Sequence, residues 1–125
     1  MIYDLSHWPE VDMAQVRAAF PEIPLSAYPS LAGYNRASIH EGLAGQGGLF
    51  LASDMARFLR LQPGLRVLDL GCGSGVTSVY LAKAFGVNVQ AVDQAPSELL
   101  FQRIARAGVG QLVTVVQSDA RQLPF

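Results

Sequence analysis

Short apolar runs alternate with amphipathic segments in the second half of the chain. Three runs predict buried strands, at residues 66–70, 87–92 and 112–117. Apolar residues in the segments between them, 76–85 and 97–107, are spaced by threes and fours, as in helices, and a glycine follows each segment. Strands joined by helical crossovers form parallel sheets with right-handed connections. The pattern therefore predicts an α/β fold with a parallel sheet.

The first half of the chain has a different pattern. Prolines interrupt it, and its helical patterns are shorter, at 12–20, at 34–43 and, most regularly, at 49–61. The last of these has one stripe at helical spacing, formed by Leu51, Met55, Phe58 and Leu59. We expect residues 1–62 to form an N-terminal helical segment and residues 63–125 a second unit. Four glycines between residues 42 and 48 predict a loop in the first of these.

Composition and charge narrow the class of protein. Half of the residues are hydrophobic and 15% are charged, which suits a packed core. The net charge of −1, without a run of Lys or Arg, disfavours nucleic-acid and anionic membrane surfaces. Cys72 is the single cysteine, and neither a secretory signal nor an apolar run long enough to span a bilayer is found. We therefore expect a cytoplasmic protein without nucleic-acid or membrane partners.

Residues 67–75, with the sequence VLDLGCGSG, carry the strongest chemical signal. They join an apolar strand that contains Asp69 to a glycine turn that opens a helix. Backbone N–H groups at such a turn can meet a carboxylate or a phosphate. Asp93 follows the next strand, 18 residues beyond Gly75, near the spacing of an acid that hydrogen-bonds ribose hydroxyls. The pattern predicts a site for a cofactor that contains a nucleoside.

Two details disfavour a dinucleotide at this site. The dinucleotide fingerprint has two residues between its last glycines, whereas Ser74 alone separates Gly73 from Gly75. Asp69 would repel a pyrophosphate and attract an α-ammonium or a sulfonium. A cofactor with adenosine at one end and an amino acid at the other satisfies both details. A dinucleotide-dependent oxidoreductase is the weaker alternative.

Residues 67–75 and Asp93 resemble the first two motifs of class I S-adenosylmethionine-dependent methyltransferases, and residues 117–125 resemble the third. The resemblance implies a Rossmann-like parallel sheet with helices on both faces, of which this chain would hold the first half. It also implies S-adenosyl-L-methionine as the cofactor, and a lid or cap role for residues 1–62, for which the four glycines between residues 42 and 48 favour a hinge. The compact N-terminal segment without a basic surface favours a small-molecule methyl acceptor. The runner-up is a binding module of the same fold without turnover.

The resemblance further implies a role for individual residues. Asp69 would face the methionine end of the cofactor, and Asp93 would hold the ribose. Gln94 would flank the adenine, Asp119 would bind its amino group, and the backbone N–H of Ala120 would address a ring nitrogen. Gly71, Cys72, Gly73 and Ser74 of the turn would form the floor of the site, and Gly75 completes the set of residues expected to bind the cofactor. The sequence assigns no catalytic residue and no metal ligands.

Structural roles compete with these assignments. Asp69 could form a cap or a salt bridge within the sheet, Asp93 could be a turn residue, and Asp119 could be a helix N-cap. Cys72 fits a small residue in a tight turn better than a nucleophile. Four residues of the N-terminal segment could reach the cofactor, although packing is favoured for each: Tyr28, Tyr34, Asn35 and His40.

The resemblance also implies a strand that is missing. The family's sheet has seven strands, and the fourth, which pairs with the first, would come after residue 125. We expect the chain to be a fragment of a longer protein, with a partner chain that supplies the rest as the alternative. The apolar edge of the first strand, which no strand of this chain is expected to cover, favours self-association.

Overall fold

The computed structural model describes residues 24–34 and 48–125. In chain order its elements are η1 Leu25–Ala27, η2 Pro29–Leu31, α3 Gly48–Leu59, β1 Arg66–Leu70, α4 Val76–Phe85, β2 Asn88–Asp93, α5 Glu98–Ala107 and β3 Val113–Gln117. The strands and helices predicted beyond residue 48 are confirmed, with ends that differ by at most two residues. The predicted helix at 12–20 and most of the one at 34–43 lie outside the described residues. So do Asn35, His40 and most of the glycine-rich hinge.

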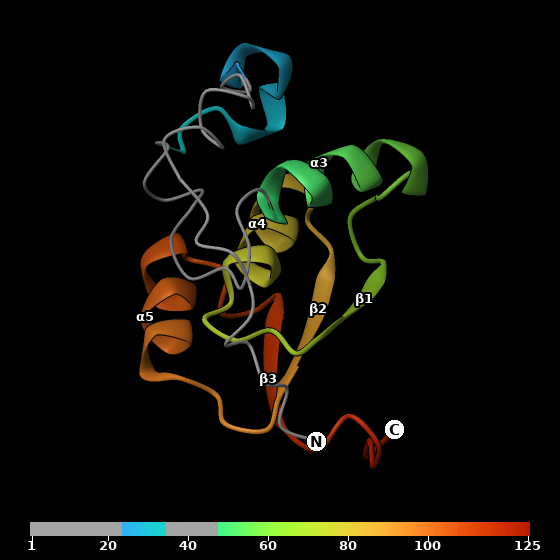
Figure 1. Ribbon diagram of the computed structural model, residues 1–125, viewed down its shortest axis with the longest axis vertical. Helices are drawn as coiled ribbons and strands as arrows, with labels where there is room; N and C mark the ends of the chain where they lie inside the picture. Colours follow the sequence, from blue (N-terminus) through green and yellow to red (C-terminus); the bar gives the residue numbers. More distant parts are fainter. Residues whose placement is uncertain (1–23, 35–47) are drawn as a thin grey trace, which may run out of the picture.

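The three strands form one parallel sheet in the order β1-β2-β3 (Figure 1). Their register places Asp69 beside Ala91 and Asp93 beside Gln117. Because all three strands run the same way, their carboxyl ends share one edge of the sheet. The residues that follow the strands in the sequence motifs therefore lie along that edge.

Helices α4 and α5 lie on the same side of the sheet (Figure 1). Alternate strand residues pack against these helices, and the shared core includes Val67, Val89, Ala91, Val113, Val79, Ala82, Leu100 and Ile104. Leu68 and Leu70 point to the other side of the sheet and are 45% and 49% exposed. The Rossmann-like parallel sheet is confirmed. The expected helices on both faces are not found in the described ranges, where α4 and α5 share one face.

Residues 24–34 are anchored to α3 and α4. Leu31 is buried in a cluster with residues of both helices. The Tyr80 hydroxyl of α4 donates a hydrogen bond to Ser30 Oγ at 2.9 Å. The rings of Tyr28 and Tyr34 pack edge-on against aromatic rings of α3 and α4, respectively. Tyr28 and Tyr34 therefore pack against neighbouring rings, as favoured from the sequence, whereas the lid role of residues 1–62 stays a prediction.

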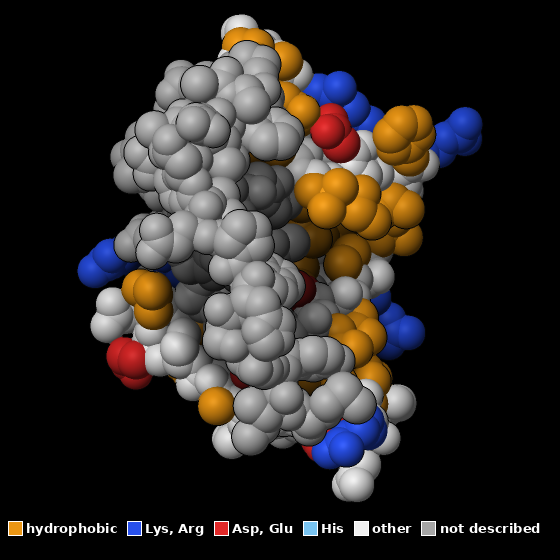
Figure 2. Space-filling view, viewed as in Figure 1, with side chains coloured by type: hydrophobic (Ala, Val, Ile, Leu, Met, Phe, Trp, Pro, Cys, Tyr) orange, Lys and Arg blue, Asp and Glu red, His pale blue; other side chains and the backbone are white. Residues whose placement is uncertain are grey.

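One side of the molecule exposes many hydrophobic side chains. Figure 2 shows them gathered where α3 and β1 lie in Figure 1. The large exposed hydrophobic residues of α3, β1 and the approach to β1 are Leu51, Met55, Phe58, Leu59, Leu65, Leu68 and Leu70. The stripe predicted for residues 49–61 is thus exposed, and α3 instead buries its neighbouring face, which includes Leu49, Phe50 and Ala56. No helix in the described ranges is long and apolar enough to cross a membrane.

Candidate functional site

The turn between β1 and α4 is held against the end of β2. The backbone N–H groups of Gly71 and Cys72 donate to the carbonyl of Val92 at 2.8 and 3.0 Å. Gly71 and Gly73 have φ angles of +76° and +52°, in the left-handed region that favours glycine. An added Cβ at either glycine would meet nothing within 4 Å. The turn is therefore tight, and open space borders it at these two positions.

Gly75 has a different task in the same turn. Its φ is +76°, and an added Cβ would overlap the Cδ1 atom of Leu100 in α5. Leu100 is fully buried, so it has little room to move. The sequence analysis counts Gly75 among the residues expected to bind the cofactor. The structure indicates that its lack of a side chain lets α5 approach the turn. Ser74, the residue before it, accepts a hydrogen bond from Arg103 Nη1 at its carbonyl, at 3.0 Å.

Asp93, the last residue of β2, contacts the glycine turn. Its carboxylate accepts hydrogen bonds from the backbone N–H of Ala95 at 3.0 Å and from that of Gly73 at 2.9 Å. These two donors, Ala95 first, lower the pKa of Asp93. The first two sequence motifs thus meet through Asp93 and Gly73. The spacing of the motifs predicted their proximity but not this hydrogen bond.

Asp69 lies on the face of the sheet that α4 covers. Its Oδ2 atom accepts a hydrogen bond of 2.6 Å from the Ser78 hydroxyl. Ser78 is fully buried in the first turn of α4. The sequence singled out Asp69 but not Ser78, because an isolated serine in a helical pattern carries no signal of its own.

Cys72 lies near both carboxylates. Burial first, and then the charges of Asp69 and Asp93, raise the pKa of its thiol to about 11. The contacts of the two carboxylates flank Cys72, since Asp93 is bonded to the N–H of Gly73 and Asp69 to the hydroxyl of Ser78. A protonated thiol is a poor nucleophile. Cys72 therefore fits the small turn residue that the sequence favoured.

The raised pKa of Cys72 predicts slow alkylation. At about pH 8 its reaction with iodoacetamide should be roughly a hundredfold slower than that of an unperturbed cysteine, because the thiolate fraction falls about tenfold for each unit of pKa. Mass spectrometry of the alkylated protein as a function of pH would measure the rate, which should rise through a pKa of about 11. The protein in denaturant is the control. Equal rates in the folded and denatured protein would contradict a half-buried thiol with a raised pKa.

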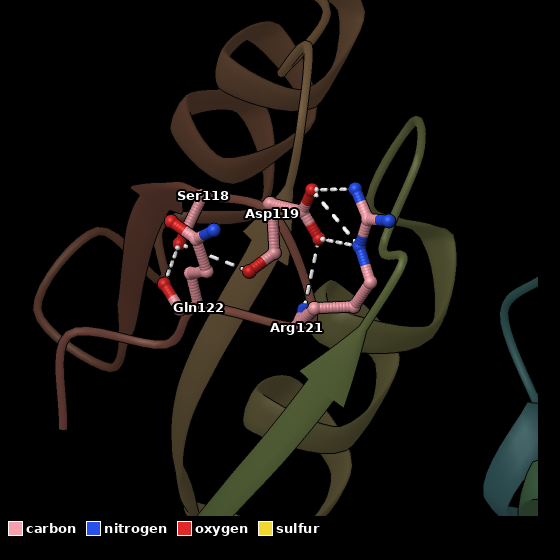
Figure 3. Close-up of polar contacts among 4 residues, drawn as sticks. All are labelled: Ser118, Asp119, Arg121 and Gln122. Carbon is pink, nitrogen blue, oxygen red and sulfur yellow. Dashed lines mark hydrogen bonds and ion pairs between the residues drawn. The ribbon is translucent and has the colours of Figure 1, made fainter.

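Asp119 lies in the turn after β3, where it binds Arg121 (Figure 3). The carboxylate accepts from the Arg121 guanidinium Nε at 3.0 Å and from the Arg121 backbone N–H at 2.9 Å. These contacts, the side chain first, lower the pKa of Asp119. The backbone N–H of Gln122 closes the turn onto the Asp119 carbonyl at 2.9 Å. Asp119 thus closes a turn here and caps no described helix, and an adenine amino group would share its carboxylate with Arg121.

Hydrogen bonds also tie the ends of β2 and β3 together. The backbone N–H of Ser118 donates to the Asp93 carbonyl at 3.0 Å, and Gln117 Nε2 donates to the Gln94 carbonyl at 3.0 Å. Gln94 and Ala120 are exposed at this edge. The predicted site residues therefore lie along the carboxyl edge of the sheet, where open α/β sheets bind ligands. Within residues 24–34 and 48–125, no group of three His, Cys, Asp or Glu could hold a metal ion.

Comparisons with known proteins give consistent matches. Residues 67–125 match a family model described as a methyltransferase domain. Phosphoethanolamine N-methyltransferase 3 of Arabidopsis thaliana is 38% identical over 61 residues, which are 49% of this chain and 12% of that protein. Ubiquinone biosynthesis O-methyltransferase of Azorhizobium caulinodans is 38% identical over 68 residues, 54% of this chain and 26% of that protein.

A solved structure shows the same similarity in three dimensions. The SAM-dependent methyltransferase from Thiobacillus denitrificans, in complex with S-adenosyl-L-homocysteine, is 26% identical with a TM-score of 0.52. The match covers 80% of this chain and 38% of that one. The chain thus corresponds to well under half the length of each of these three proteins.

Proposed function

We propose that the protein is a class I S-adenosylmethionine-dependent methyltransferase that transfers a methyl group from S-adenosyl-L-methionine to a small-molecule acceptor; the match of residues 67–125 to a methyltransferase domain and the likeness to a solved SAM-dependent methyltransferase support this. The observation that carries this proposal is that Asp93 accepts a hydrogen bond from Gly73 in the glycine turn, while Asp69 of the neighbouring strand is bound by Ser78 of the helix that the turn opens. The names of the relatives support it, since phosphoethanolamine is a small molecule.

The residues at this edge fit S-adenosyl-L-methionine. The carboxylate of Asp93 keeps lone pairs for ribose hydroxyls beyond its two bonds to backbone N–H groups. Asp69 offers a negative charge to the α-ammonium group. The open space beside Gly71 and Gly73 allows a ligand to approach the backbone closely.

In the proposed reaction this chain's residues act mainly by binding and orientation. Bound S-adenosyl-L-methionine would supply a methyl group that its sulfonium has already activated. Asp69, Asp93 and the turn would hold it in one pose, which lowers the entropic cost of an in-line approach by the acceptor. Gln94, Asp119 and the Ala120 N–H are proposed to contact the adenine. No described residue is assigned as a general base.

Isothermal titration calorimetry would test the cofactor. We expect saturable binding of S-adenosylhomocysteine and none of NAD under the same conditions. The reverse result would support a dinucleotide-dependent oxidoreductase instead. Binding of S-adenosylhomocysteine by a protein that methylates no small amine, hydroxyl or carbon acid would support a binding module without turnover.

We also propose that the outer edge of β1 pairs with a second copy of the chain. No strand of the described ranges lies beside that edge, and Leu68 is 45% exposed next to it. The Leu68→Lys variant should shift the protein towards monomer in sedimentation velocity, because lysine on an edge strand opposes pairing. Phe101→Lys, at a residue 47% exposed on α5, is the matched control. A protein that is monomeric at every concentration, or equal behaviour of the two variants, would contradict this proposal.

A cytoplasmic location without nucleic-acid or membrane partners is the last part of the proposal. The net charge of −1 and the single cysteine support it. Cell fractionation would test it, and recovery of the protein with membranes or outside the cell would contradict it.

A further inference from the structure

We infer that Ser78 is a positioning residue for Asp69, so that one oxygen of the carboxylate is held by α4 and the other is presented to the amino-acid end of S-adenosyl-L-methionine. The inference rests on the proposed function. Its geometric basis is the 2.6 Å hydrogen bond from Ser78 Oγ to Asp69 Oδ2. A hydrogen bond of this length to a carboxylate belongs to the strong, charge-assisted class.

The surroundings of Asp69 explain why the carboxylate needs such a partner. Asp69 shares its face of the sheet with Val67 and the buried Ala91, which belong to the apolar core under α4 and α5. A carboxylate on such a face is costly unless hydrogen bonds compensate for lost water. The Ser78 hydroxyl provides this compensation from the helix side. It also limits rotation of the carboxylate about its bond to the strand.

The local structure of α4 leaves the Ser78 hydroxyl available for this task. Serine hydroxyls inside helices often bond to the carbonyl four residues earlier, which here is that of Ser74. In this structure the Ser78 hydroxyl donates to Asp69 Oδ2, and the Ser74 carbonyl accepts a hydrogen bond from Arg103 Nη1. Ser78 is fully buried, so its hydroxyl exchanges no hydrogen bonds with bulk water. Bulk water therefore does not compete for the hydrogen bond that this hydroxyl donates to Asp69.

The positioning role predicts that Ser78 affects the binding of only one part of the ligand. Asp69 is proposed to meet the amino-acid end, whereas Asp93, at the end of the neighbouring strand, is proposed to meet the ribose. Loss of the Ser78 hydroxyl should therefore weaken only ligands that carry the amino-acid end. A serine that merely stabilised α4 would affect every ligand equally, because α4 follows the whole turn.

Two probes separate these possibilities. S-adenosylhomocysteine contains the amino-acid end, and 5′-methylthioadenosine retains the adenosine and the sulfur but lacks it. In calorimetric titrations, Ser78→Ala should lower the affinity for S-adenosylhomocysteine about tenfold, the size expected for one hydrogen bond to a charged group. The affinity for 5′-methylthioadenosine should change by less than about twofold. Ser78→Thr, which keeps the hydroxyl, should restore most of the affinity. Adding Ser78→Ala to Asp69→Asn should have little further effect, because coupled residues are not additive.

The outcomes are distinguishable. Equal weakening of both ligands by Ser78→Ala, or no weakening of either, would overturn the positioning role. A wild-type protein that binds neither ligand would instead overturn the proposed function. If Ser78→Ala melts below the titration temperature, Ser78→Cys takes its place, since the thiol is similar in size but a weak donor. If Ser78→Cys loses affinity for S-adenosylhomocysteine alone, the positioning role of Ser78 is supported. Unchanged affinity for S-adenosylhomocysteine would oppose it.

Discussion

Replacing Asp93 with alanine should weaken S-adenosylhomocysteine binding by about a hundredfold. Two charge-assisted interactions would be lost together, each worth about tenfold in affinity. One is the proposed contact of the carboxylate with the ribose hydroxyls. The other is the 2.9 Å hydrogen bond that holds the Gly73 N–H and so shapes the turn. Calorimetric titration would measure the loss, and thermal melting would confirm that the variant is folded.

Two further variants help to explain the loss of affinity in Asp93→Ala. Asp93→Asn keeps one acceptor oxygen and loses the charge, so its affinity should fall by only about tenfold. Glu98→Ala removes an exposed acid from the first turn of α5 and should leave the affinity unchanged. If Asp93→Ala behaved like Glu98→Ala, Asp93 would be an ordinary residue at the end of a strand.

The pH dependence of the same interaction has a definite sign. The N–H groups of Ala95 and Gly73 lower the pKa of Asp93 below its ordinary value of 3.8. A carboxylate with a lowered pKa in the folded state stabilises the fold above its ordinary pKa, and this stabilisation is lost as pH falls through the lowered value. The contribution of Asp93 should therefore persist to about pH 4, and the difference in stability between wild type and Asp93→Asn should shrink only below that.

Replacing Gly75 with alanine should destabilise the fold by about 3 kcal/mol. Overpacking of a core typically costs about 1–3 kcal/mol, and a left-handed backbone costs a residue with a side chain about 1–2 kcal/mol. Both penalties apply, because the φ of Gly75 is +76° and an added Cβ would overlap Leu100. Chemical denaturation would measure the free energy of unfolding. The melting temperature should fall by more than about 10 °C for a domain of this size.

Gly108→Ala is the matched control for the Gly75 prediction. Its φ is +68°, but an added Cβ there would meet nothing within 4 Å. It should therefore report the backbone penalty alone, about 1–2 kcal/mol. Combining Gly75→Ala with Leu100→Ala should cost less than the sum of the two single changes, because the second removes the clash. Equal destabilisation by Gly75→Ala and Gly108→Ala would contradict a close approach of α5 to the turn.

The strands and the two helices between them could be predicted because the spacing of their apolar residues agrees with the glycines that mark where the helices end. Gly86 and Gly108 follow α4 and α5 as expected, and both have left-handed φ angles. The faces of the helices were harder to predict. Lys83 lies three residues after Tyr80, at helical spacing, yet Lys83 is exposed and Tyr80 is fully buried. The spacing of residues along a helix does not show which of its faces packs against another element.

The site could be predicted at the level of motifs but not of contacts. Asp69 and Asp93 were identified because strand ends and glycine turns have fixed spacings. The bond from Ser78 to Asp69 depends on the rotation of α4, which a single sequence does not reveal. The pairing of Asp119 with Arg121 is local. Asp side chains in turns often accept a hydrogen bond from the backbone N–H two residues later, so Asp119 was itself a detectable turn signal. The binding roles of the predicted residues stay predictions.

The order of the strands has a consequence for how this part of the protein is made. Each strand pairs with the one that precedes it in the chain, from β1 to β2 to β3. Contacts between neighbours in sequence form early, since little chain must be closed into loops. As the polypeptide leaves the ribosome, the sheet can therefore grow by one strand at a time. The turn of Gly73 would meet Asp93 as soon as β2 has docked, so this part of the proposed cradle can form before β3 has paired and brought Asp119 to the same edge.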